Sequence, residues 1–146
     1  MVQFRHRVSE LIGKQGVEAY QGSVRYVQAT RSVGLRRAVV SSSANCHDLL
    51  VAAGIADLFE VRIDGVVAAE RKLPGKPSPG TFLAAAEDLG VPAEQAAVFE
   101  DALAGMDAGR SGGFCYVIGV DRDQADELRR HGADVVVQDL SDLPQP

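Results

Sequence analysis

The chain has 146 residues, of which 46% are hydrophobic and 24% charged, with a formal net charge of −5 and a pI near 5.1. This length and composition predict one soluble domain with a sizeable core. The acidic balance argues against a nucleic-acid partner, and the lack of a long apolar run argues against a membrane partner and a secretory leader, so we expect a cytoplasmic protein.

Helices and short apolar strands are expected to alternate from about residue 20 onward. Ser23, after Gly22, is predicted to N-cap the first helix, which stops at Gly34. The later strands are expected over 35–40, 61–63, 97–99, 115–120 and 135–137, with an Asp64-Gly65 turn after the second of them. Between these strands we expect a helix opened by Asn45 with Asp48 and ended at Gly54, a helix from Ser78-Pro79 to Gly90, a helix over 102–110, and a helix opened by Asp123 with Asp126 and ended at Gly132.

This alternation predicts an α/β fold with a Rossmann-like parallel sheet covered by helices on both faces. In such sheets the functional residues lie beyond the carboxyl ends of the strands. Ser41 follows the strand that ends at Val40, and Glu100-Asp101 follow the strand that ends at Phe99. We therefore expect these polar residues to gather at one edge of the sheet.

The segment Ser41-Ser42-Ser43-Ala44-Asn45 lies between a predicted strand and a predicted helix start. Free backbone N–H groups at such a turn attract anions, and the hydroxyls of Ser41 and Ser43 and the amide of Asn45 can add hydrogen bonds to phosphate oxygens. Capping of the following helix accounts equally well for the same residues. On this segment alone both interpretations stay open.

Lys76 lies in Gly75-Lys76-Pro77-Ser78-Pro79, outside any predicted helix or strand. An exposed surface lysine is the ordinary interpretation, but the two prolines stiffen the loop and hold the ammonium group in one place. A fixed ammonium neutralises the charge that develops on a transferring phosphoryl group. The Lys76–Pro77 bond could be cis or trans.

Glu100 and Asp101 are adjacent carboxylates directly after an apolar strand. They repel each other, and neither is cheap to bury. A bound Mg²⁺, which takes one or two carboxylates plus phosphate oxygens and water, resolves this conflict. The other interpretation is that both residues begin the following helix, where acidic groups suit the helix dipole.

Other catalytic patterns are absent from the sequence. There is no GxGxxG, P-loop, GxSxG or HExxH pattern. Cys46 and Cys115 are far apart and are expected to be reduced thiols.

Together, the order Ser, Lys-Pro, Glu-Asp resembles the haloacid dehalogenase superfamily, and within it the β-phosphoglucomutase-like group. The phrases that resemble this family's second, third and fourth motifs are Val39-Val-Ser-Ser-Ser-Ala-Asn45, Gly75-Lys-Pro-Ser-Pro-Gly-Thr-Phe82 and Val98-Phe-Glu-Asp-Ala-Leu-Ala-Gly105. Gly80 and Ala44 depart from the pattern, because the family usually has an aspartate at the first position and the phosphomutases often have a basic residue at the second.

The resemblance implies a role for each matching residue. Ser41 would bind the phosphoryl group with help from Ser42, Ser43 and Asn45, and Lys76 would stabilise its charge. Asp101 and Glu100 would hold Mg²⁺. The implied reaction is Mg²⁺-dependent phosphoryl transfer, by a phosphatase or phosphomutase, on a small phosphorylated metabolite such as a sugar phosphate.

The family's first motif is a strand ending in Asp-x-Asp, which supplies the nucleophile and a general acid/base. No Asp-x-Asp precedes Ser41. Residues 1–19 resemble the remnant of the last helix of a cap domain with its linker, and residues 20–146 the C-terminal portion of the core. We therefore expect a truncated form that is inactive alone and lacks the central first strand of the sheet.

A sheet without its central strand exposes unpaired backbone groups. Direct pairing of the flanking strands, exchange with a second copy, or a missing N-terminal segment would have to complete it. A competing hypothesis is a non-catalytic remnant that binds phosphate or a protein partner.

Overall fold

The computed structural model describes residues 2–4, 21–120, 124–144 and 146. Within these ranges the chain forms one six-stranded sheet, in the order β3-β2-β1-β4-β5-β6, with every neighbouring pair parallel. The strands are β1 (Val2–Phe4), β2 (Arg37–Val40), β3 (Val61–Ile63), β4 (Ala97–Glu100), β5 (Tyr116–Val120) and β6 (Val135–Val137). The predicted parallel α/β architecture is confirmed.

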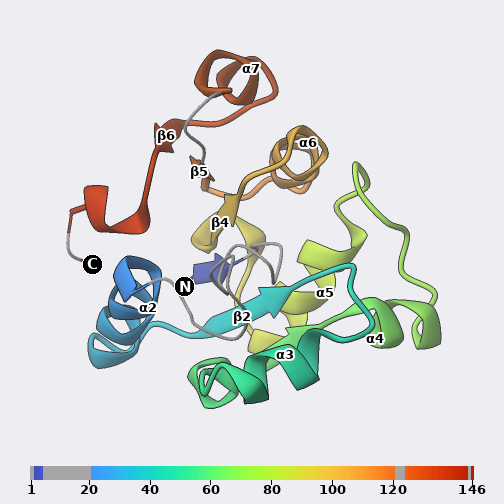
Figure 1. The fold of residues 1–146 in the computed structure, drawn as a ribbon. Helices are drawn as coiled ribbons and strands as arrows, with labels where there is room; N and C mark the ends of the chain where they lie inside the picture. The colour runs from blue at the N-terminus through green and yellow to red at the C-terminus, as the bar shows by residue number, and fades with distance from the viewer. Residues whose placement is uncertain (1, 5–20, 121–123, 145) are drawn as a thin grey trace.

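The centre of the sheet is occupied by β1, which lies between β2 and β4 (Figure 1). Phe4 is in register with Val39 on one side and with Phe99 on the other. The prediction that the sheet lacks a central strand is therefore wrong for this structure, because three residues from the beginning of the same chain fill that position. No local pattern in the sequence indicates this strand, since strand pairing between distant segments depends on the whole fold.

The division at residue 19 into a cap remnant and a core stays a prediction, because residues 5–20 lie outside the described ranges. Within the predicted cap remnant, residues Val2–Phe4 form β1 of the sheet rather than part of a helix.

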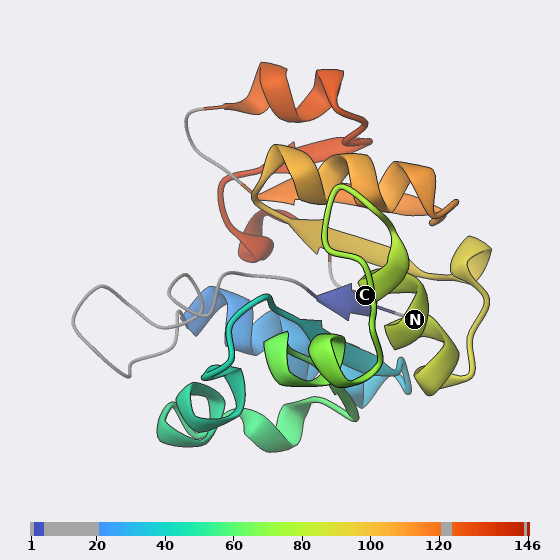
Figure 2. The same ribbon diagram turned by 90° about the vertical axis from the view of Figure 1, so that its right-hand side faces the viewer.

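Helices cover both faces of the sheet, as Figures 1 and 2 show. The helices in the described ranges are α2 (Gln21–Ser32), α3 (Cys46–Ala52), α4 (Gly65–Glu70), α5 (Gly80–Leu89), α6 (Leu103–Ser111) and α7 (Ala125–Arg130), with 3₁₀ turns at Ala56–Leu58, Ala93–Gln95 and Leu140–Asp142. None of these helices is long and apolar enough to cross a membrane.

Alternate residues of β2 and β4 lie in two different cores. Val39 and Phe99 pack with residues of α2 and α3, such as Val27 and Leu50. Val40 and Val98 pack on the other face, against a group that includes Phe82 of α5. Strands buried on both faces read as continuous apolar runs, which is why β2 and β4 could be recognised in the sequence.

Several predicted helix starts differ from the observed ones. Helix α2 begins at Gln21, and Ser23 is a buried residue inside it rather than its N-cap. Asn45 precedes α3, but its side chain makes no capping hydrogen bond. The expected helix end at Gly90 is confirmed, with φ of 73° in the left-handed region that glycine adopts at low cost.

The segment after β3 holds a helix that the sequence did not predict. Asp64 and Gly65 were expected to form a turn, but Asp64 is the N-cap of α4, and its carboxylate accepts a hydrogen bond from the N–H of Val67 at 2.9 Å. The β-branched residues that follow Gly65 have low helix propensity, so this short helix depends on its cap and on tertiary packing.

The central position of β1 predicts a specific cost for losing one backbone donor. Proline at residue 3 removes the N–H of Gln3 from a strand that is paired on both sides. We expect Gln3→Pro to lower the free energy of unfolding by at least about 1–3 kcal/mol, the cost of an unmade buried hydrogen bond. Gln3→Thr keeps the N–H and is the control in urea unfolding; equal stability of the two variants would mean that β1 is not part of the sheet.

Candidate active site

The serine segment lies at the carboxyl end of β2. Ser41 is 7% exposed, and its N–H donates to the carbonyl of Ile63, at the end of β3, at 2.9 Å. Ser43 is half-buried, while Ser42 and Asn45 are exposed. The segment therefore forms an ordered loop on the sheet edge where the sequence placed it.

Two serine hydroxyls shape this loop by accepting backbone hydrogen bonds. The N–H of Ser43 donates to Oγ of Ser41, and the N–H of Asn45 donates to Oγ of Ser43, each at 3.1 Å. A hydroxyl that accepts in this way still has its own O–H to donate. Forming the turn and binding a phosphate oxygen are therefore compatible tasks for Ser41 and Ser43.

Cys46, the first residue of α3, is buried next to this loop. Burial, with a further contribution from the negative charge of Asp64, raises the pKa of its thiol to about 11. The thiol is thus protonated at neutral pH and is a poor nucleophile.

Lys76 is held in place by an ion pair with the buried carboxylate of Glu100. Its Nζ lies 3.1 Å from Oε2 of Glu100, with the two side chains 12% and 1% exposed. The same Nζ lies 5.8 Å from the ring centroid of Phe82, within the range of a cation–π contact. The Lys76–Pro77 peptide bond, which the sequence left open, is cis.

Glu100, the last residue of β4, also accepts two hydrogen bonds from the backbone that follows it. Its Oε1 accepts from the N–H of Asp101 at 3.1 Å and from the N–H of Ala102 at 3.2 Å. Both carboxylate oxygens thus bind groups of the chain, and the carboxylate fixes Lys76 at the carboxyl end of β4. Its predicted role as a metal ligand remains a prediction.

Gly105 of α6 makes room for Glu100. A Cβ built on Gly105 would overlap Cγ and Cδ of the Glu100 side chain. Gly105 lies in the motif Val98–Gly105, but no role for it could be predicted from the sequence, because its contact with a residue of β4 is visible only in the folded chain.

The register of the sheet places Ser41 and Asp101 on opposite sides of β1. Val39, Phe4 and Phe99 lie in one row across three adjacent strands, and Ser41 and Asp101 each follow that row by two residues. Two strand spacings of ~4.8 Å separate them, about 10 Å in all. The serine loop and the carboxylates thus lie on the two sides of the central strand, at the same edge of the sheet.

Glu100 and Asp101 can supply only some of the ligands that a hard divalent cation takes. In the described ranges no group of three or more His, Cys, Asp or Glu side chains lies close enough together to hold a metal ion. Mg²⁺, however, is commonly bound by one or two carboxylates, with substrate phosphate and water as the other ligands. Asp101, assisted by Glu100, is suited to supply these one or two carboxylate ligands.

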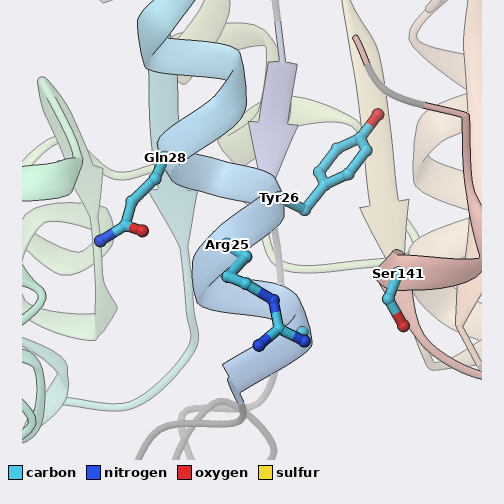
Figure 3. A pocket seen from close by; sticks show the side chains of 5 residues that line it. Arg25, Tyr26, Gln28 and Ser141 are labelled. Atoms are coloured by element: carbon cyan, nitrogen blue, oxygen red, sulfur yellow. The ribbon is translucent and has the colours of Figure 1, made fainter.

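A hollow elsewhere on the surface lies between α2 and the 3₁₀ turn Leu140–Asp142 (Figure 3). The described residues that line it include no carboxylate. Arg25, Tyr26 and Gln28 of α2 line it with Ser141, and Figure 3 shows Gln28 and Tyr26 pointing in different directions. The side chains do not converge on one point, so the sheet edge is the candidate active site.

The contact between Gly105 and Glu100 predicts a large effect for a single methyl group. Gly105→Ala should displace the Glu100 carboxylate and the Lys76 ammonium with it, at a cost of about 1–3 kcal/mol for overpacking. Gly75→Ala, at a position where an added Cβ meets nothing within 4 Å, should be close to neutral. Urea unfolding of both variants is the measurement, and equal stabilities would show that the fit around Glu100 is loose.

Comparison with known proteins agrees with the resemblance drawn from the motifs. The sequence profile of the haloacid dehalogenase-like hydrolases matches residues 2–113. A β-phosphoglucomutase of Mycobacterium bovis is 50% identical over 138 residues, which are 92% of this chain and 53% of that protein. The chain thus spans about half the length of the curated relatives it matches first.

Solved structures agree on the fold. A β-phosphoglucomutase of Clostridium difficile matches with a TM-score of 0.75 and 27% identity, covering 86% of this chain and 52% of that one. A haloacid dehalogenase family hydrolase of Deinococcus radiodurans, solved with bound phosphate and sodium, matches with a TM-score of 0.74 and 30% identity, covering 86% and 57%. Since the profile matches most of the chain and the sheet and motifs agree with it, this protein belongs to the haloacid dehalogenase-like hydrolase family.

Proposed function

We propose that this chain carries the phosphate- and cation-binding part of a Mg²⁺-dependent phosphoryl-transfer site for a small phosphorylated metabolite, a sugar phosphate. The reaction is that of a phosphatase or of a β-phosphoglucomutase-like phosphomutase. The observation that carries the proposal is the partly buried ammonium of Lys76, which Glu100 fixes at the carboxyl edge of the sheet. A partly buried, paired lysine at this edge has a stabilising partner and is also in place to bind an anion.

Each residue has a task that follows from its chemistry. The O–H groups of Ser41 and Ser43 donate to phosphate oxygens, and the exposed Ser42 and Asn45 can add donors at the rim of the loop. Lys76 neutralises charge on the phosphoryl group as it transfers. Mg²⁺, when bound by Asp101 and Glu100, would neutralise further charge on the phosphate oxygens.

The names of similar proteins support the choice of substrate class. The Mycobacterium bovis relative is a β-phosphoglucomutase, and the Deinococcus radiodurans structure holds a phosphate ion. Neither name reports what this chain binds, so both the sugar phosphate and the metal are part of the proposal.

The proposal includes the prediction that the 146-residue chain does not turn over by itself. Phosphoryl transfer through a covalent intermediate needs a nucleophilic carboxylate, and the sequence directly after β1 is Arg5-His6-Arg7. The Cys46 thiol is protonated at neutral pH and does not replace it. We propose that the nucleophile is supplied by a segment outside these 146 residues.

Hydrolysis of p-nitrophenyl phosphate by the purified chain, with Mg²⁺ and with EDTA, tests the prediction that the chain is inactive alone. We expect no turnover above that of the Asp101→Asn variant under either condition. Turnover that requires Mg²⁺ and is abolished by Asp101→Asn would confirm the metal role of Asp101 and show that the missing-nucleophile argument is wrong.

A non-catalytic protein that binds phosphate, or a partner through the same surface, is the second candidate. Two features favour it: the ordered serine loop, which can donate hydrogen bonds to phosphate, and the lack of a carboxylate at the three positions directly after β1. Calorimetric titration with inorganic phosphate separates the two candidates. Affinity that rises with Mg²⁺ and loses that rise in Asp101→Asn supports the enzyme site, whereas affinity independent of Mg²⁺ supports the binding protein.

A further inference from the structure

The corner between β3 and α4 contacts the serine loop at several points, and the roles proposed above do not use it. We propose that this corner, Ile63-Asp64-Gly65, fixes the conformation in which the loop binds phosphate, with Gly65 as a positioning residue. The inference rests on the proposed function, because it concerns the same phosphate site. Its residues are the last residue of β3, the N-cap of α4 and the first residue of α4, all outside the motifs that pointed to the family.

Two backbone hydrogen bonds join the corner to the loop. The N–H of Ser41 donates to the carbonyl of Ile63 at 2.9 Å, and the N–H of Gly65 donates to the carbonyl of Ser43 at 3.1 Å. They hold the loop at its first and third residues, the two serines whose hydroxyls accept from the backbone. The direction of the serine O–H groups therefore depends on the position of the corner.

Gly65 allows a close approach that no other residue allows. A Cβ at this position would lie 2.6 Å from the carbonyl oxygen of Ser42 and 3.2 Å from both the Ser43 carbonyl carbon and the Ala44 nitrogen. All three are backbone atoms of the loop, so the clash cannot be relieved by turning a side chain. Any residue larger than glycine must push the loop away from β3.

Asp64 holds the corner itself in place. Its buried carboxylate accepts from the N–H of Val67 at 2.9 Å and from Nε of Arg62 at 2.9 Å. Arg62 also contacts Nδ1 of His47 at 2.7 Å, in the first turn of α3. The corner is thus tied both to α4 and to the helix into which the serine loop leads.

The geometry separates the effect on phosphate from the effect on a cation. The corner touches the serine loop after β2, whereas Asp101 follows β4, on the other side of β1. A shifted loop should misplace the phosphate donors and leave the carboxylates where they are. Loss of phosphate affinity with unchanged cation affinity is the signature of this positioning role.

The test compares Gly65→Ala with Gly75→Ala in calorimetric titrations with inorganic phosphate and, separately, with Mn²⁺ as a probe for the cation site. Alanine is the better helix former, so in the first turn of α4 the change should not harm the helix itself. We expect Gly65→Ala to weaken phosphate binding at least about tenfold, as when one hydrogen bond to a charged group is lost. Mn²⁺ binding should be unchanged, and Gly75→Ala should bind both ions like the original chain.

Equal phosphate affinity of the two variants would overturn the inference, and so would parallel loss of phosphate and Mn²⁺ binding in Gly65→Ala. If the original chain binds no phosphate at all, the proposed function fails before this comparison. Should Gly65→Ala not fold, Asp64→Asn carries the test, because it keeps the volume of the side chain but weakens its bond to Arg62. Weaker phosphate binding with unchanged Mn²⁺ binding is expected there too, and unchanged phosphate binding would contradict the inference.

Discussion

The backbone hydrogen bonds of β1 join two parts of the sheet, β3-β2 on one side and β4-β5-β6 on the other. Ser41 belongs to the first part, and Glu100 and Asp101 to the second. Without a strand between them, β2 and β4 would expose unpaired N–H and C=O groups along two buried, apolar strands. The width of β1 also sets the interval between the serine loop and the carboxylates, so one pairing determines both the stability of the sheet and the geometry of the site.

At the edge of this sheet, the ion pair between Lys76 and Glu100 determines where the positive charge of the candidate site lies. Burying two charges costs free energy, and in this molecule the cost is offset by additional hydrogen bonds to Glu100 and by the ring of Phe82 beside the ammonium. Gly105 provides the space in which the carboxylate lies. Such a pair is weak evidence for stability alone, but it places a cation at an edge where a phosphate is expected.

The sequence predicted where the candidate site residues lie in the fold better than it predicted the elements that position them. Ser41 and Glu100-Asp101 were recognisable because apolar strands precede them and the carboxyl ends of parallel strands share one edge. β1 was not predicted, because a three-residue strand carries no periodic signal and its place depends on non-local pairing. Gly65 and Gly105 act through contacts between segments distant in the chain, which no local pattern reveals.

The most direct test of the central claim is a calorimetric titration with inorganic phosphate, with and without Mg²⁺, of the original chain, Lys76→Met and Lys72→Met. Both variants lose one positive charge, but Lys72 is exposed, whereas Lys76 is paired with Glu100. We predict that Mg²⁺ tightens phosphate binding, that Lys72→Met preserves it, and that a folded Lys76→Met weakens it at least about tenfold. Equal phosphate affinity of the two variants would contradict the account, since the ammonium of Lys76 would then have no part in holding phosphate.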